Sequence, residues 1–317
     1  MKKSKSIKFG FDLGGTKIQP YAEYEDGELL KSELGSEIIW EEDVHLIDKT
    51  GDSDEEKRNK IINTMLNQLE KYMEKANAEV QQIKSVGMVA PGEVIDNIIV
   101  RMFNIGLDNY DISKDFIKEA ENRGYKISAK IKIEKDLKGA LYGEYKRGVA
   151  KGERGKIVAL GFGTGTGSAV MENGILSEES FEYGHEKMPG REEDIVCSCG
   201  ETDCIEIYTS MSKLFLEISK ELGRETTLNG YEVKELLKNK NEVALRKYKE
   251  WLNNITEAYI NIANKLNPDM LLMFGSILHL ISREEIKEMN EKIKNCPLKR
   301  SSLGSKAQVI GAALLSN

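Results

Sequence analysis

The chain has 317 residues, of which 40% are hydrophobic, so it can build one large or two ordinary globular domains around a packed core. Its formal charge of −7 argues against a nucleic-acid-binding protein, which would present a basic surface. No apolar run approaches the ~18 residues of a membrane span, and no apolar secretion segment follows the basic first residues. We therefore expect a cytoplasmic protein with neither a membrane nor a nucleic-acid partner.

The first half of the chain opens with strand patterns. Alternating apolar residues predict a strand from Ile7 and a second over residues 17–24, joined by a turn at Gly14-Gly15. Asp26-Gly27 is a hairpin signal that leads to a third strand over residues 28–34 and completes an antiparallel meander. The elements predicted next are a helix begun by a capping box at Ser53–Glu56, a strand over 85–90, an extended run over 94–100, a helix over 113–124, a strand over 126–134 and a helix from Asp136 to Tyr145. This succession predicts an α/β domain with ligand sites at the carboxyl ends of its strands.

The second half opens in the same way. A strand over residues 156–161, a glycine-rich turn over 163–167, a strand over 168–172 and a hairpin signal at Asn173-Gly174 follow one another. The repeat predicts two related halves facing each other. The later elements are predicted as helices over 205–222, 232–238, 242–266, 283–294 and 305–315, with a buried strand over 270–274.

Two glycine-rich turns are candidates for phosphate binding. The first contains Asp12 and Gly14-Gly15, and the second contains Gly163 and Gly165. Glycine lets backbone N–H groups approach an anion, and a carboxylate such as that of Asp12 could hold a magnesium-bound water. Tight β-turns that bind nothing are the alternative, and neither stretch has the spacing of a P-loop or a dinucleotide fingerprint. Two such turns in one chain favour phosphate binding.

Asp136 stands between a predicted strand and a predicted helix. A carboxylate there could accept a proton from a substrate hydroxyl. A helix N-cap is the structural alternative, and for an isolated Asp it is the better one.

Three of the four cysteines cluster. Cys197, Cys199 and Cys204 lie close together in the sequence, and His185 precedes them. Three thiolates and one imidazole complete a tetrahedral zinc shell and leave no position for a water, so the metal is predicted to be structural. Glu182 and Glu206 bracket the cluster and are not needed as ligands.

These motifs together resemble the ROK family of sugar kinases and sugar-responsive repressors, within the hexokinase–actin ATPase superfamily. The resemblance runs nearly from end to end. It rests on the following segments: Asp12-Leu-Gly-Gly-Thr-Lys17, Pro91-Gly92, Phe103-Asn104, Glu134-Lys135-Asp136, Gly163-Thr-Gly-Thr-Gly167, Glu182-Tyr-Gly-His185 and Cys197-x-Cys-Gly-x₃-Cys-x-Glu206.

The resemblance implies a role for each motif in an ATP-dependent sugar kinase of the glucokinase or hexokinase type. Asp136 would be the general base that deprotonates a sugar hydroxyl for attack on the γ-phosphate of ATP, and closure of the two domains would exclude water. The residues implied to bind ATP and Mg²⁺ are Asp12, Gly14, Gly15, Thr16, Lys17, Gly163, Thr164, Gly165, Thr166, Gly167 and Gly275. The residues implied to bind the sugar are Asn104, Lys135, Glu182, His185 and Glu206. Structural Zn²⁺ bound by His185, Cys197, Cys199 and Cys204 would fix the sugar pocket while the second edge of His185 meets the sugar.

The chain departs from the family pattern at Lys135, where the family has Asn. Lys135 could pair with Glu134, obstruct a hexose, or favour an unusual or acidic sugar. Phe274-Gly275-Ser276 replaces a Gly-Gly pair near the expected adenosine site.

The fold implied is α/β, with two ribonuclease H-like, actin-like ATPase domains flanking an active-site cleft. The expected boundaries are residues 1–125 for the small domain, joined by a helix over 303–317, and 126–302 for the large domain with the zinc site. A homodimer is the expected assembly. Alternatives are a kinase for fructose, an N-acylmannosamine or a glycoside, and a non-catalytic or regulatory sugar-binding protein. Because the phosphate motif begins at Asp12, we expect no repressor-type DNA-binding domain ahead of it.

Overall fold

The computed structural model describes residues 5–14, 17–30, 52–102, 105–127, 129–179 and 181–315, together with the backbone of residues 44–45. The chain forms two compact units, Met1–Lys151 with Ser305–Asn317 and Gly152–Gly304, and each is described by itself. Among the helices of the described ranges, none combines the length and apolar character that crossing a membrane requires.

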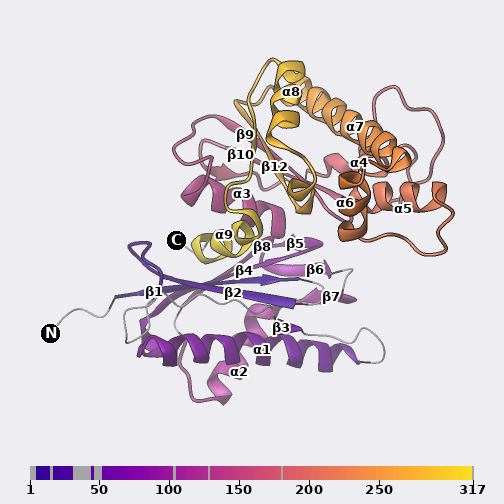
Figure 1. Ribbon diagram of the computed structural model, residues 1–317. Coiled ribbons are helices and arrows are strands. Elements are labelled where there is room, and N and C mark those ends of the chain that lie inside the picture. The colour runs from indigo at the N-terminus through magenta and orange to yellow at the C-terminus, as the bar shows by residue number, and fades with distance from the viewer. Residues whose placement is uncertain are drawn as a thin grey trace. The chain divides into compact units, whose positions relative to one another are not determined.

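The first unit is built on a five-stranded sheet in the order β3-β2-β1-β4-β8 (Figure 1). Its strands are β1 (Ile7–Leu13), β2 (Lys17–Tyr24), β3 (Val44–His45), β4 (Ile83–Ala90) and β8 (Lys130–Lys135). β1 is antiparallel to β2 and parallel to β4, and β4 is parallel to β8. The predicted hairpin of β1 and β2 is therefore confirmed. Of the predicted third strand, Leu29 forms one bridge to Glu23, and residues 31–34 lie outside the described ranges.

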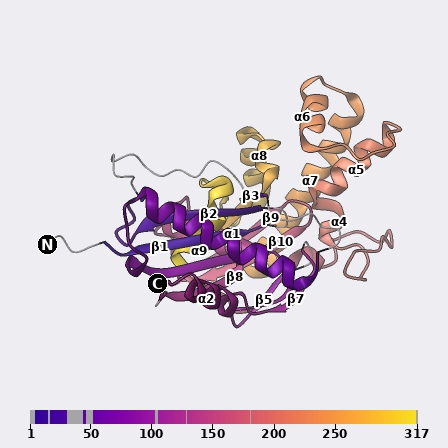
Figure 2. The same cartoon turned by 90° about the horizontal axis from the view of Figure 1, so that it is seen from below.

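Two helices cover each face of this sheet. α1 (Asp54–Lys75) and α2 (Ile112–Asn122) pack on one face, and α3 (Asp136–Arg147) and α9 (Ala307–Leu315) lie on the other (Figures 1 and 2). α1 begins with the predicted capping box, in which Ser53 and Glu56 each bond the other's backbone N–H. Its apolar stripe, with Leu66 and Leu69, joins the core beneath the sheet.

Glycines let α9 pack directly on backbone. A Cβ at Gly311 would lie 1.8 Å from the carbonyl oxygen of Gly139 in α3, and one at Gly143 would lie 2.3 Å from that of Ala307. On the sheet side, a Cβ at Gly87 would lie 1.7 Å from the carbonyl oxygen of Ala312. A side chain at any of these sites would force α9 away from its neighbours.

A small antiparallel sheet completes this unit. It contains β5 (Glu93–Ile95), β6 (Ile98–Met102) and β7 (Leu107–Tyr110). The single extended run predicted over 94–100 is wrong, because the chain turns at Asp96-Asn97, where φ is 49° and 65°. Asn and Asp tolerate this left-handed conformation, which two-residue hairpins require.

The second unit repeats the topology of the first. Its sheet has the order β11-β10-β9-β12-β13 and contains β9 (Lys156–Phe162), β10 (Thr166–Glu172), β11 (Ile175–Leu176), β12 (Met270–Phe274) and β13 (Leu298–Arg300). β9 is antiparallel to β10 and parallel to β12, which is parallel to β13. The prediction of two related halves is therefore confirmed at the level of strand order and direction.

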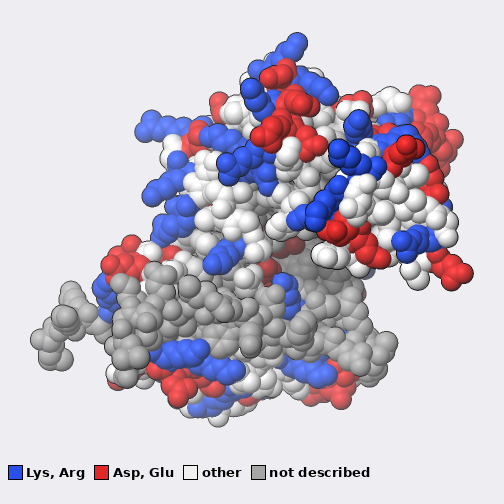
Figure 3. All heavy atoms as spheres, viewed as in Figure 1, with Lys and Arg blue, Asp and Glu red and all other residues white. Residues whose placement is uncertain are grey.

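The helices of this unit are α4 (Ile205–Thr209), α5 (Met211–Glu221), α6 (Gly230–Lys238), α7 (Glu242–Leu266) and α8 (Arg283–Ile293). One helix predicted over 205–222 is therefore two, because the chain is extended at Ser210 (φ −68°, ψ 148°). Trp251 Nε1 donates to the carbonyl oxygens of Thr209 (2.9 Å) and Ser210 (3.3 Å) at the break. Basic and acidic side chains are interspersed over the face of residues 152–304 that Figure 3 shows.

The boundary between the units lies between Lys151 and Gly152, whereas the sequence placed it after residue 125. β8 is a parallel partner of β4 from Ser85 to Ala90, and the α3 that follows it packs on α9. Both elements therefore belong to the first unit. The return segment begins at Ser305.

Candidate active site and metal centre

The first glycine-rich turn joins β1 to β2. Asp12 pairs with Gln19 in the hairpin, and a Cβ at Gly14 would come within 3.0 Å of the carbonyl oxygen of Lys17. Asp12 is half-buried and Lys17 is exposed. Two predicted residues of this motif, Gly15 and Thr16, lie outside the described residues, as does Asn104 of the predicted sugar site.

Asp136 follows the carboxyl end of β8 and is the first residue of α3. The N-cap is Lys135, whose side chain makes no capping bond, so the N-cap alternative for Asp136 is not what the structure shows. The Leu137 N–H donates to Asp136 Oδ1 at 2.7 Å. The helix N-terminus and this N–H together stabilise an anionic carboxylate.

Glu134 pairs with a lysine that the sequence analysis did not single out. Lys138 Nζ lies 3.6 Å from Glu134 Oε1, and both side chains are largely buried. The Lys135 N–H donates to the same oxygen at 3.0 Å. Glu134 lies in β8 and Lys138 in α3, so the i,i+4 rule for helices did not predict this pair.

The second glycine-rich turn connects β9 to β10, and several of its groups are bonded within the unit. The Gly163 N–H donates to the carbonyl oxygen of Gly165 at 2.9 Å, and the Thr166 N–H donates to Glu206 Oε2 at 2.8 Å. Thr164 is exposed at the tip, whereas Thr166 is buried. Gly167 is paired with Gly161 in the hairpin.

Gly275 follows β12 beside the end of β9. Its φ is +101°, and a Cβ there would lie 2.2 Å from the carbonyl oxygen of Phe162. β9 and β12 are parallel, so Gly275 and the second glycine-rich turn both follow the carboxyl ends of their strands, at the same end of the sheet. Glycine is therefore required at this position both by conformation and by close approach.

The motif from Glu182 to His185 packs on the second glycine-rich turn. A Cβ at Gly184 would lie 2.0 Å from the carbonyl oxygen of Thr166, so only glycine fits there. Buried Tyr183 anchors the segment by donating from its hydroxyl to the carbonyl oxygen of Ala258 at 2.8 Å. Two motifs that the sequence analysis treated separately are thus neighbours.

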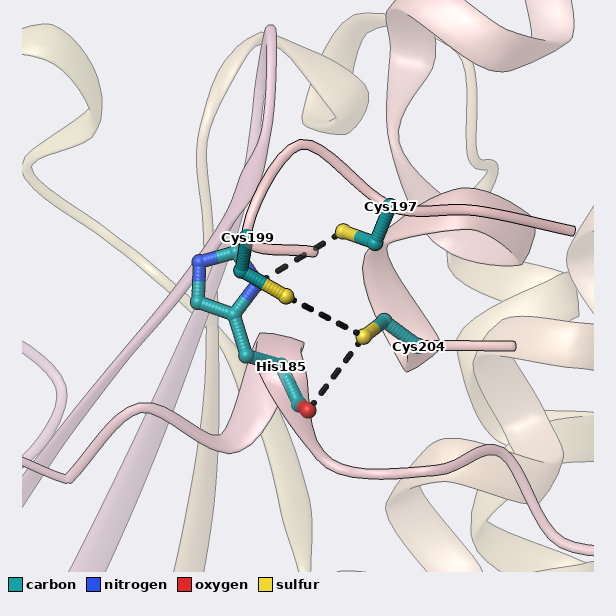
Figure 4. A group of neighbouring side chains, drawn as sticks. All are labelled: His185, Cys197, Cys199 and Cys204. Carbon is teal, nitrogen blue, oxygen red and sulfur yellow. Dashed lines mark hydrogen bonds between the residues drawn. The ribbon is translucent and has the colours of Figure 1, made fainter. Parts of the chain in front are cut away.

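His185, Cys197, Cys199 and Cys204 converge as predicted, with one ligand atom of each within 4.8 Å of the others (Figure 4). Cys197 Sγ lies 3.7 Å from His185 Nδ1, and Cys199 Sγ lies 3.6 Å from Cys204 Sγ. A tetrahedron with zinc–sulfur bonds of about 2.3 Å has sulfur–sulfur edges of about 3.8 Å, so the four side chains fit zinc. The second ring nitrogen of His185 points away from the thiols in Figure 4.

The thiols differ in their surroundings. The N–H of Glu201 lowers the pKa of the exposed Cys199 thiol, whereas burial raises the pKa of the Cys204 thiol. A bound cation would favour the thiolate of each.

Asp203 organises the loop over residues 193–204, the cysteine loop, and was not among the residues that the sequence pointed to. Its carboxylate accepts the N–H groups of residues 193–195 at 3.1 to 3.2 Å and the Tyr208 hydroxyl at 2.7 Å. Burial alone would raise the pKa of Asp203, but these hydrogen bonds outweigh it and hold that pKa below its usual range. The carboxylate thereby fixes the chain on both sides of the cysteine pair Cys197 and Cys199.

The repeated sheet topology, with helices on the strands and glycine turns at corresponding places, defines a protein of two ribonuclease H-like units, the actin-like ATPase fold. The sequence profile of the ROK family matches residues 8–317, and the chain belongs to the ROK family.

Two sequence relatives carry different activities in their names. The polyphosphate glucokinase of Mycobacterium leprae is 24% identical over 231 residues, which are 73% of this chain and 56% of the relative. A putative xylose repressor of Caldicellulosiruptor sp. is 25% identical over 285 residues, which are 86% of this chain and 66% of the relative. The chain therefore spans little more than half of the first relative and about two thirds of the second.

Two solved structures share the fold. The ROK hexokinase from Thermus thermophilus has a TM-score of 0.74 and 20% identity, with 98% of this chain and 97% of that chain covered. A ROK family glucokinase from Streptomyces griseus, solved with glucose and AMPPNP, has a TM-score of 0.74 and 18% identity, with 98% and 99% covered.

Proposed function

We propose that this ROK protein is an ATP-dependent sugar kinase with Asp136 as its general base. The observation that carries the proposal is the placement of Asp136 at the carboxyl end of the parallel strand β8, as the first residue of α3. Kinases and hexokinases among the relatives and neighbours support the same class.

In the proposed reaction, the Asp136 carboxylate accepts the proton of a sugar hydroxyl. The hydroxyl oxygen forms a bond to the γ-phosphorus of ATP as the bond from that phosphorus to the bridging oxygen breaks, and ADP leaves. The N-terminus of α3 stabilises the carboxylate that begins the step.

Backbone N–H groups of the second glycine-rich turn, together with the first glycine-rich turn, would bind the phosphates of ATP. The N–H groups of Thr164 and Gly165 have no acceptor among the residues that the structure describes, so they can meet a phosphate. Asp12, Gly14 and Lys17 would serve the other phosphates together with Gly15 and Thr16. Asp12 supplies the hard oxygen that magnesium prefers, and Mg²⁺ would neutralise charge on the phosphates.

The sugar would be bound by Glu182, His185 and Glu206, with Asn104 and Lys135 from the other motifs. Zinc held by His185 and the three cysteines would fix the tautomer of the imidazole and leave its second nitrogen for a sugar hydroxyl. No chemical step needs this metal.

A coupled assay for ADP over a panel of hexoses, amino sugars and glycosides tests the proposal. A parallel assay with inorganic polyphosphate examines the donor that the name of the M. leprae relative suggests. We expect ADP release to depend on one sugar class and on Mg²⁺. A panel without turnover from either donor would contradict the proposed kinase.

A sugar-binding regulator is the second candidate, because the putative xylose repressor aligns with 86% of this chain. Calorimetry with sugars, the ADP assay and a DNA-binding assay together distinguish the two. Sugar binding without turnover, together with retention on DNA at physiological salt, would favour the regulator.

A further inference from the structure

The second glycine-rich turn is held by the segment that follows the cysteine loop. Glu206 Oε2 accepts the Thr166 N–H at 2.8 Å, and the hydroxyls of Thr166 and Thr209 lie 2.9 Å apart. At the other end of the turn, the Met211 N–H donates to the carbonyl oxygen of Gly163 at 3.0 Å. α4 and the first residue of α5 therefore fasten the turn at both ends.

The hydrogen bonds of Thr209 determine the direction of the Thr166 hydroxyl. Thr209 Oγ1 donates to the carbonyl oxygen of Ile205 at 2.8 Å, so the hydrogen between the two hydroxyls belongs to Thr166. Both donors of Thr166, its N–H and its O–H, thus point into the protein. Thr166 is 5% exposed, and it cannot at the same time donate to a phosphate.

Glu206 also accounts for the glycine at position 165. A Cβ there would lie 2.3 Å from Glu206 Oε2, and the φ of Gly165 lies outside the left-handed region. Glycine at this position leaves room for the carboxylate where it accepts the Thr166 N–H. A Cβ at Gly163 would meet nothing within 4 Å, so the same restriction does not apply there.

We propose that Glu206 is a positioning residue for the phosphate-binding turn, assisted by Thr209. By holding the Thr166 N–H inward, Glu206 leaves the N–H groups of Thr164 and Gly165 as the donors that face a phosphate. This inference rests on the proposed function, since it takes the turn to bind the phosphoryl donor. It gives Glu206 a role at the donor site that is separate from a sugar contact.

Calorimetry of the whole protein with Mg²⁺–AMPPNP and, separately, with glucose tests the inference. Glu206→Ala removes a hydrogen bond to a charged acceptor, so we expect AMPPNP to bind roughly tenfold or more weakly. Glu206→Gln keeps an oxygen that can accept the Thr166 N–H, and we expect it to restore AMPPNP affinity to within about threefold of the parent. Glu192→Gln, at an exposed position before the cysteine cluster, controls for the loss of one charge.

The side chain of Thr209 is fully buried, so an effect of its substitution cannot come from a lost contact with the sugar. Thr209→Val should weaken AMPPNP binding by roughly three- to tenfold with unchanged glucose affinity, and Thr209→Ser should restore it. In both Glu206→Ala and Thr209→Val, hydrogen exchange of peptides spanning residues 160–168 should be faster than in the parent.

The outcomes separate the two proposals. A parent that binds no AMPPNP overturns the proposed function and this inference with it. The inference alone is overturned if the parent binds AMPPNP but the Glu206→Ala variant loses only its affinity for glucose and keeps slow hydrogen exchange in the turn.

Discussion

At the scale of single residues, the position of Asp136 is the most informative result. The sequence left open whether this carboxylate caps a helix or accepts a proton. Lys135 occupies the N-cap, and Asp136 lies one residue further on with its carboxylate bonded to the next N–H. Asp136 is therefore the first residue of α3 and not its N-cap.

Asp136→Asn should lower kcat by about 10²- to 10⁴-fold, because an amide cannot accept the hydroxyl proton. The amide oxygen can still accept the Leu137 N–H, so we expect the melting temperature to stay close to that of the parent. Steady-state ADP release and a thermal melt check both expectations. Parent-like turnover in this variant would remove Asp136 from the mechanism.

Asp203→Asn should weaken metal binding by roughly tenfold or more, the usual effect of losing a group that orients metal ligands. The amide N–H₂ would face backbone N–H groups that now donate to Asp203, so the loop before Cys204 would lose its anchor. Competition with a chromogenic chelator measures zinc affinity. Glu192→Gln, whose side chain is exposed, is the control and should bind zinc like the parent.

At the scale of helices and strands, local sequence predicted most elements but not their interruptions. Residues 205–222 keep a helical pattern throughout, yet the helix breaks at Ser210, whose side chain caps α5. Trp251 Nε1 donates to the carbonyl oxygens of Thr209 and Ser210 at the break. That indole lies in α7, far along the chain. The break exposes the Met211 N–H, which then reaches the glycine-rich turn.

Short edge strands were missed for a related reason. β13 (Leu298–Arg300) pairs with Leu271 to Met273 of β12, and its three residues carry no alternation long enough to identify. Such a strand is determined by its partner and not by its own sequence. The two opening hairpins, β1 with β2 and β9 with β10, in contrast contain long alternating runs around a glycine-rich turn, and both were predicted.

Gly311→Ala should destabilise the protein by about 1–3 kcal/mol, because the new Cβ would meet the carbonyl oxygen of Gly139 in α3. Urea unfolding followed by circular dichroism measures the change. Gly230→Ala in α6 is the matched control: its Cβ would meet only Phe215 at 3.4 Å. Helix propensity then makes that variant equal to the parent or more stable by up to about 1 kcal/mol. Equal stability of the two variants would contradict the close packing of α9.

At the scale of the whole molecule, the metal site was predictable because its ligands carry their own chemistry. Cys197, Cys199, Cys204 and His185 were identified from residue type and spacing, and the structure brings them together. The contact between Thr166 and Glu206, which are 40 residues apart, was not predictable. It depends on where α4 lies on the sheet, and no local pattern encodes that position. The assignments of Asp136, Lys135 and the sugar-binding residues stay predictions.

Removal of zinc by a chelator should lower the melting temperature and make Cys199 the fastest thiol to react, since it is exposed and the N–H of Glu201 lowers the pKa of its thiol. Cys296 should stay slow, since it is buried and burial, reinforced by Asp269, raises the pKa of its thiol. A raised pKa keeps this thiol protonated, and hence slow to react, at neutral pH. Titration with a thiol reagent before and after chelation counts the groups, and added Zn²⁺ should restore protection. Four fast thiols, or an unchanged melt, would contradict the structural role of the metal.

The placement of α9 has a consequence for biosynthesis. The second unit is continuous in the chain, whereas the first needs residues from Ser305 onward. On the ribosome, the sheet of the first unit is made early. It lacks α9, which packs on the sheet at Gly10 and Gly87, until the second unit has emerged. Since domains generally fold as units during synthesis, the second unit can fold before the first has received its last helix, α9. A released chain that ends before Ser305 should therefore expose the first unit to protease while the second resists it.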